Sequence, residues 1–109
     1  MFDTIIADFD ALYPNQVPHE IKTKWLDRLE GQMKDQFALG GTNGLIGAAP
    51  YDEVYIHYLA MKCAERGGDT VRYNNASSAF AAAYNELANY ITRNTKSKNV
   101  RYRHVLGLF

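Results

Sequence analysis

Four stretches of the chain place apolar residues three and four positions apart, and this spacing constrains the fold most. Residues spaced in this way lie on one face of an α-helix, and that face has to be buried against another element. Proline- or glycine-containing breaks separate the stretches, at residues 14–18, 39–50 and 67–68. The pattern therefore predicts an all-α fold, a small four-helix bundle with a glycine-rich loop between the second and third helices.

The predicted helices cover residues 2–13, 18–37, 50–68 and 69–94. Asp3 and Asp69 are the expected N-caps of the first and fourth helices, since a carboxylate can accept a free N–H of the first turn. A proline opens each of the other two helices. Gly67 and Gly68 end the third helix, because glycine adopts the left-handed conformation that closes a helix.

The second predicted helix is amphipathic. Its expected buried face consists of Ile21, Trp25, Leu26, Leu29, Met33 and Phe37. Its charged residues are expected to face solvent, namely Lys22, Lys24, Asp27, Arg28 and Glu30. Gly31 lies in the middle and costs roughly 1 kcal/mol relative to alanine. Either the helix tolerates this glycine, or a neighbouring helix approaches closely there.

Residues 39–50 contain four glycines and cannot form a stable helix. A phosphate-binding loop is excluded, because no GK[ST] element follows and no predicted strand precedes the segment. We expect a flexible surface loop or a small hairpin.

The 109 residues suit a single domain, and 12 basic residues balance 12 acidic ones. The charges are uneven, however. Residues 96–109 hold four of the bases and no acid, so the first 95 residues carry 12 acids and 8 bases. This argues against a dedicated nucleic-acid-binding protein that coats phosphates. An acidic body with a basic tail indicates two surfaces with different partners.

The single cysteine, Cys63, excludes an internal disulfide framework and a multi-cysteine metal site. The apolar runs are too short to span a bilayer, and the N-terminus lacks the basic region of a signal peptide. We infer a protein without membrane contact that folds in a reducing cytoplasm.

The C-terminal residues 95–109 differ in pattern from the rest of the chain. Side chains alternate with a period of two around Tyr102, which favours an extended segment, and the chain ends in an apolar Leu-Gly-Leu-Phe. We therefore divide the chain into a helical body, residues 1–94, and a basic C-terminal arm, residues 95–109. An isolated strand is not stable, so the arm needs a partner.

The sequence offers little catalytic chemistry. His19, His57 and His104 lie on three different elements, and no histidine stands beside Cys63 in a recognisable nucleophile arrangement. We expect no catalytic residue, no metal site and no cofactor. Several large side chains are expected to pack in the core or between subunits, rather than to stack on bases: Trp25, Leu29, Tyr51, Tyr55, Tyr58, Tyr73, Phe80, Tyr84 and Tyr90.

Four stretches also resemble a known family. They are Pro14 and Asn15, then Lys22 with WLDRLEGQM, then PYDEVYIHYL from Pro50, and last GDTVRYNNASSAFAAAYNELANYITR from Gly68. In order and spacing, the chain from residue 10 to residue 93 resembles head–tail connector (adaptor) proteins of tailed phages and prophages. Two regions depart from that pattern. Relatives often have a longer, acidic insert in place of GGTNGLIGAA, and the basic tail does not align.

This resemblance implies a structural virion protein without enzymatic activity. It implies a homo-oligomeric ring of about twelve copies, docked under the portal protein at the capsid vertex. Such a ring extends the DNA channel, passes DNA without sequence-specific binding, and presents a surface to the next neck or tail protein. Its location is the virion neck, after assembly in the host cytoplasm.

Within this interpretation, the C-terminal arm is expected to dock on the portal by adding a strand or threading between subunits. The apolar anchors are Val100, Tyr102, Leu106, Leu108 and Phe109, and Arg101 and Arg103 pair with portal acids. The alternative is an arm that folds back onto its own body.

Three other functions stay open at this point. A small nucleic-acid-binding module would use the basic tail and the tyrosines, and its affinity would fall steeply with salt. A tail completion or terminator protein is a second alternative, more often a β-rich ring. An enzyme would need a pocket with His57, Cys63 or tyrosines of shifted pKa.

Overall fold

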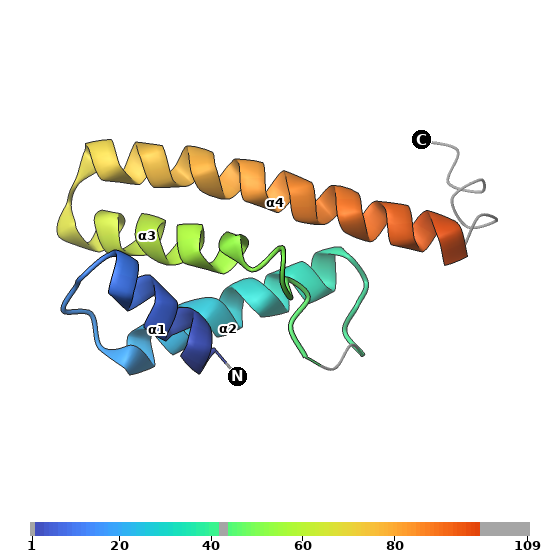
Figure 1. The fold of residues 1–109 in the computed structure, drawn as a ribbon, viewed down its shortest axis with the longest axis horizontal. Helices are drawn as coiled ribbons and strands as arrows, with labels where there is room; N and C mark the ends of the chain where they lie inside the picture. Colours follow the sequence, from blue (N-terminus) through green and yellow to red (C-terminus); the bar gives the residue numbers. More distant parts are fainter. Residues whose placement is uncertain (1, 42–43, 99–109) are drawn as a thin grey trace.

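The computed structural model describes residues 2–41 and 44–98, with side chains up to residue 94. These residues form four helices and no strand: α1 (Asp3–Leu12), α2 (His19–Gln36), α3 (Glu53–Gly67) and α4 (Thr70–Lys98). The predicted all-α, four-helix fold is thereby confirmed. In Figure 1, α3 lies in the middle, α4 runs antiparallel along one side of it, and α1 and α2 lie along the other.

Two predicted helix ends are confirmed in atomic detail. The Asp69 carboxylate accepts the backbone N–H of Arg72 at 3.1 Å, which is an N-cap at the start of α4. Gly68 follows α3 with φ of 72°, the left-handed conformation that glycine adopts without strain. Together these residues reverse the chain between α3 and α4 within a two-residue connection.

Two other predicted starts are wrong. Asp3 is not a cap of α1, because Phe2 holds that position and the Asp3 carboxylate instead lies 3.0 Å from Nε2 of His19. The third helix begins at Glu53 rather than Pro50. Residues 50–52 form a turn that leads into it, with the Tyr51 N–H bonded to the Ala48 carbonyl.

The core lies around the first half of α3, where Val54, Tyr55 and Leu59 are fully buried. The other helices contribute the rest of the buried apolar side chains, among them Phe2, Ile5, Ile6, Phe9, Leu26, Leu29, Met33, Leu87 and Ile91. Because every helix packs on α3, this helix fixes the positions of α1 and α4 relative to each other.

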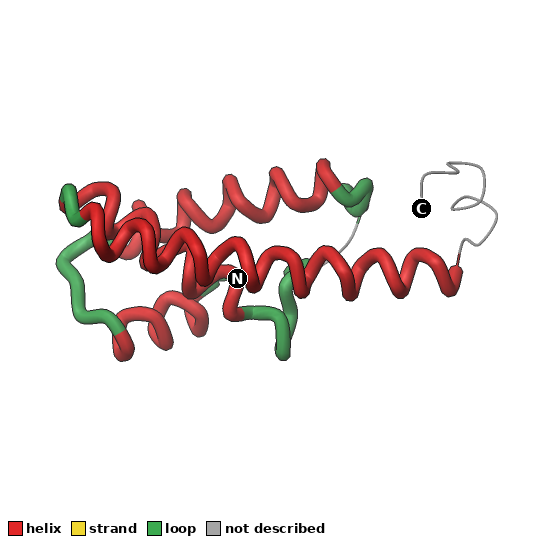
Figure 2. The backbone as a smooth tube through the Cα atoms, turned by 90° about the horizontal axis from the view of Figure 1, so that it is seen from above, coloured by secondary structure: helices red, strands yellow, loops and turns green. Residues whose placement is uncertain are grey.

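The fourth helix is about twice as long as the helix it packs on. Its 29 residues span about 43 Å, whereas the 15 residues of α3 span about 22 Å. Figures 1 and 2 show the second half of α4 continuing past the start of α3. There Leu87 is fully buried, and the ring of Tyr90 stacks on Tyr51 with 4.6 Å between centroids. The helix also continues four residues past the predicted boundary at residue 94.

The loop between α2 and α3 is packed into the fold. Leu39, Leu45 and Ile46 lie against the hydrophobic core, and Gly47 is buried. The other described positions, Ala38, Gly40, Gly41, Gly44 and residues 48–50, are exposed, so the segment lies at the surface and only its apolar residues pack inward. Its described part, residues 37–41 and 44–52, contains no strand of the kind a hairpin would need.

The buried face of α2 is rotated from the predicted one. Lys22 and Glu30, both expected in solvent, are 2% and 5% exposed, whereas Ile21 and Trp25 are only partly buried. Both charged side chains have polar partners that lie far away in the sequence, as described below. Gly31 faces open space, because a Cβ added there would meet nothing within 4 Å, so no helix approaches closely at this position.

Candidate functional site

Lys22 anchors the turn between α1 and α2. Its Nζ donates to Oδ1 of Asp10 at 2.6 Å and to Oδ1 of Asn15 at 3.2 Å. Asn15 in turn donates to Asp10 at 2.9 Å and accepts the N–H of Val17 at 3.0 Å. The buried ammonium is therefore satisfied by a carboxylate and an amide, as a buried charge requires. We call Lys22, Asp10 and Asn15 the lysine cluster.

The lysine cluster also changes the acidity of Asp10. Partial burial alone would raise the pKa of its carboxyl, but the hydrogen bonds from Lys22 and Asn15 and the charge of Lys22 outweigh that effect. The pKa of Asp10 is consequently lowered from its ordinary value of 3.8. Asp10 thus remains ionised at neutral pH and keeps the end of α1 attached to α2.

A second buried polar group fixes the loop before α3. The Tyr55 hydroxyl donates to Oε1 of Glu30 at 2.5 Å and accepts the N–H of Gly47 at 2.9 Å. The other carboxylate oxygen of Glu30 accepts the N–H of Ile46 at 2.8 Å. We call Glu30, Tyr55 and the two loop N–H groups the glutamate cluster. It joins α2, α3 and the loop through side chains that are nearly inaccessible to solvent.

Burial and the neighbouring Glu30 carboxylate both raise the pKa of Tyr55 well above its ordinary value of 10.0. The phenol thus stays a hydrogen-bond donor at physiological pH. Tyr55 therefore has a structural role, because its buried side chain is not accessible to a substrate.

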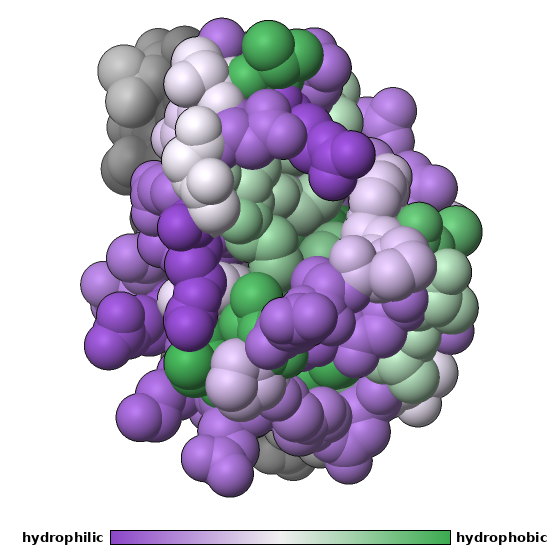
Figure 3. All heavy atoms as spheres, turned by 90° about the vertical axis from the view of Figure 1, so that its left-hand side faces the viewer, coloured by the Kyte–Doolittle hydropathy of each residue, from purple (hydrophilic) through white to green (hydrophobic). Residues whose placement is uncertain are grey.

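An apolar groove lies at the end of the molecule where α1 ends and α4 begins. It has a volume of about 830 Å³. Its floor is one face of α3, and its walls are the end of α1 with the following turn and the first half of α4. The lining is mainly apolar, with Phe9, Leu12, Tyr13, Ala60, Cys63, Ala64, Ala76 and Ala79. Figure 3 faces this end, where apolar side chains gather in a hollow between polar rims.

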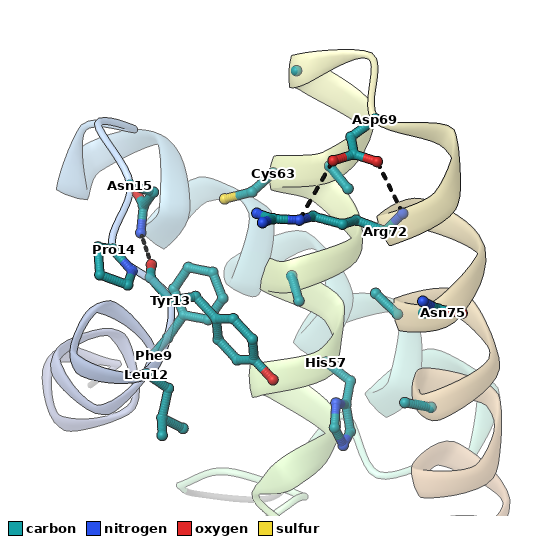
Figure 4. A pocket seen from close by; sticks show the side chains of 15 residues that line it. Phe9, Leu12, Tyr13, Pro14, Asn15, His57, Cys63, Asp69, Arg72 and Asn75 are labelled. Atoms are coloured by element: carbon teal, nitrogen blue, oxygen red, sulfur yellow. Dashed lines mark hydrogen bonds and ion pairs between the residues drawn. The ribbon is translucent and has the colours of Figure 1, made fainter.

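The groove exists because α1 and α4 both pack on α3 and leave a space between them. Figure 4 shows Leu12 and Tyr13 on the α1 side and Asp69, Arg72 and Asn75 on the α4 side. Asp69 and Arg72 form an ion pair with 3.4 Å between Oδ2 and Nε. The lysine cluster holds the turn of Tyr13 and Asn15 in place, so one wall of the groove is fixed by a salt bridge in which Lys22 is buried and Asp10 is partly exposed.

The groove contains His57 and Cys63, two of the residues that an enzymatic pocket would use. They are six positions apart on α3, which separates them by about 9 Å along the helix axis. Figure 4 shows them well apart, with the imidazole directed away from the sulfur. Burial raises the pKa of the Cys63 thiol, which disfavours the nucleophilic thiolate. This geometry does not form a nucleophile–base pair.

The large side chains expected in the core or between subunits divide into three groups. Tyr55 and Leu29 lie in the core. Tyr58, Phe80 and Tyr84 form a line of ring contacts that continues to Phe37 at the end of α2, and the Tyr84 hydroxyl bonds to Gln36. The remaining side chains, Trp25, Tyr51, Tyr73 and Tyr90, are partly exposed, and Trp25 lies 5.8 Å from the ammonium of Lys62.

The residues expected in the portal-docking arm, Val100 to Arg103, Leu106, Leu108 and Phe109, lie outside the described residues, as does His104. Within the described chain, no group of three or more His, Cys, Asp or Glu residues lies close enough to hold a metal ion. None of the helices in residues 2–41 and 44–98 has the length and apolar composition needed to cross a membrane.

Comparison with known proteins gave no match to a protein-family model, to a curated protein or to a solved structure.

Proposed function

We propose that this protein is a structural component of a phage neck, a head–tail connector that forms a ring on the portal and extends the DNA channel. The proposal depends on the sequence resemblance described above, and one structural observation supports it. Asn15, Lys22, Glu30 and Tyr55 all belong to the motifs that carry the resemblance, and they are the side chains of the two polar clusters apart from Asp10. The motifs that carry the resemblance thus supply polar contacts that hold the helices of the body together.

The surface charge fits a channel protein better than a DNA-binding protein. α1 carries three acids and no base, and residues 2–94 carry 12 acids against 8 bases. A protein that binds DNA tightly releases counter-ions with clustered lysine and arginine side chains, and an acidic body does not do so. An acidic wall would let DNA pass without binding it, as the proposed role requires. A β-rich tail completion or terminator protein fits less well with four helices.

The proposal is tested by co-sedimentation with the portal ring encoded beside this gene. Two chains are compared, the full-length protein and one that ends at Lys98, so that α4 stays intact. Stoichiometric binding of the full-length chain alone supports both the connector and the docking arm. Binding by both chains supports the connector and removes the arm. Binding by neither contradicts the proposal, and a salt titration with DNA then tests the nucleic-acid-binding alternative.

A further inference from the structure

The groove has an unusually exposed apolar wall. Leu12 is 65% exposed and Tyr13 is 47% exposed, and these are two of the four most exposed large apolar residues in the described chain. Both belong to the groove. Exposed apolar side chains beside an apolar hollow are typical of a surface that another chain covers.

The segment after α4 has the matching composition. Residues 100–109 read VRYRHVLGLF, with six large apolar side chains and no acid. A segment of this composition can bind a hydrophobic groove by burying its large apolar side chains there.

The same chain cannot fill its own groove with this segment. The nearest α4 residue of the groove, Ala79, is 19 residues before Lys98, which is about 28 Å along the helix. Asp69, which caps the start of α4 at the far side of the groove, lies about 43 Å from Lys98 along the helix. Residues 99–109 span at most about 40 Å when fully extended. The chain would spend most of that length returning along α4, and only its last residues would arrive at the near edge.

The tail and the body also have complementary charges. The segment from Lys96 onward carries four bases, whereas the rest of the chain has an excess of four acids. The two charged residues that line the groove, Asp69 and Arg72, pair with each other, so the attraction comes from the excess of acids on the body as a whole. A basic tail is attracted to an acidic body, and this attraction holds between two copies as well as within one.

We propose that the groove binds the C-terminal residues 100–109 of a second copy of this chain. Each copy then offers a tail at one end and a groove at the other, which is a heterologous contact that can close into a ring. The inference rests on the ring of the proposed function and names the contact that holds its copies together. A copy whose tail residues are docked on the portal cannot place the same residues in the groove of another copy.

The single cysteine allows a direct test. A full-length chain with Cys63→Ala and Leu106→Cys is mixed with the unmodified chain and oxidised with copper phenanthroline at mildly alkaline pH. The expected product is a mixed disulfide between the introduced tail thiol and Cys63, identified by peptide mass mapping. The matched partner carries Cys63→Ala and Ala81→Cys, with a thiol on the exposed face of α4. We expect the groove thiol to react at least about tenfold faster, through its higher effective concentration.

If Cys63 and the cysteine introduced at position 81 react with the tail thiol at equal rates, the proposal is wrong. Binding of the tail in the groove would have to favour Cys63 over the more accessible thiol at position 81. A chain that carries Leu106→Cys with Cys63 intact gives a further outcome. If it forms an intramolecular disulfide at high dilution, the tail binds its own body and the proposal fails.

A second pair of variants tests the groove without any cysteine chemistry. Ala76→Arg fills the groove, whereas Ala81→Arg adds the same side chain to the outer face of the same helix. Sedimentation equilibrium should show self-association weakened at least about fivefold by Ala76→Arg and unchanged by Ala81→Arg. Equal effects contradict the proposal. Neither experiment contains portal protein, so loss of portal binding and loss of this contact are observed separately.

Discussion

At the scale of single residues, the charged side chains inside this small body decide how its elements join. Lys22 is 3% exposed at its side chain, and Asp10 is its closest partner. A buried ammonium with no counter-ion is unfavourable, so removing the acid costs more than replacing the lysine by an apolar side chain of similar length.

We therefore expect Asp10→Asn to destabilise the fold by about 2 kcal/mol and Lys22→Met by less than about 1 kcal/mol. In the double variant, the loss should be close to that of Lys22→Met alone, because no unpaired charge remains. Urea denaturation of the four proteins measures this cycle. Additive losses would show that the two side chains do not interact.

Tyr55 gives the fold a dependence on alkaline pH. Its pKa is raised in the folded protein by burial and by Glu30, whereas in the unfolded chain it titrates near its ordinary value of 10.0. The unfolded state therefore releases a proton that the folded state retains, and stability is complete below that value and declines as pH rises above it. We expect this decline to be shallower in Tyr55→Phe than in the unmodified protein. Parallel curves of unfolding free energy against pH would contradict the assignment.

At the scale of elements, two glycines that look alike in the sequence have opposite roles. Gly31 lies within α2 with open space around it, whereas a Cβ on Gly47 would lie 2.8 Å from the ring of Tyr55. Gly47 is thus the loop position where backbone and core approach closely, and Gly31 only weakens its helix.

We expect Gly31→Ala to stabilise the protein by about 0.5–1 kcal/mol, through the better helix propensity of alanine. Gly47→Ala should destabilise it by about 1–3 kcal/mol, because the Tyr55 ring has to move away from Glu30. Thermal unfolding followed by circular dichroism distinguishes the two. A stabilised Gly47→Ala protein would mean that the loop does not pack as described.

The elements also show what could be predicted from local sequence. The cap at Asp69 and the left-handed Gly68 were predictable, because each depends on a few adjacent residues. The burial of Lys22 and Glu30 was not, since their partners Asp10 and Tyr55 are 12 and 25 residues away. Lys22, Leu26 and Glu30 are spaced four residues apart and therefore lie on the same face of the helix as a buried leucine. The prediction nevertheless placed both charged residues in solvent, because it gave more weight to charge than to spacing.

At the scale of the whole molecule, the four-helix architecture followed from the periodicity, and the groove did not. The groove depends on the distance between two helices that each pack on a third, and no local pattern encodes that distance. The same applies to the length of α4. No glycine or proline follows Gly68 before Gly107, and the change of periodicity at residue 95 predicts a helix end there, whereas the helix continues to Lys98.

The short connection between α3 and α4 has a consequence for folding kinetics. Because Gly68 and Asp69 alone separate these helices, bringing them together closes a very short loop and costs little chain entropy. The α3–α4 hairpin is therefore the expected folding nucleus, and α1 docks after the barrier. Substitutions at its contact, such as Phe80→Leu against Tyr58, should give φ-values above about 0.5, and Ile6→Val in α1 should give values below about 0.3. The contact between α3 and α4 therefore forms first, and α1, which supplies one wall of the groove, packs last.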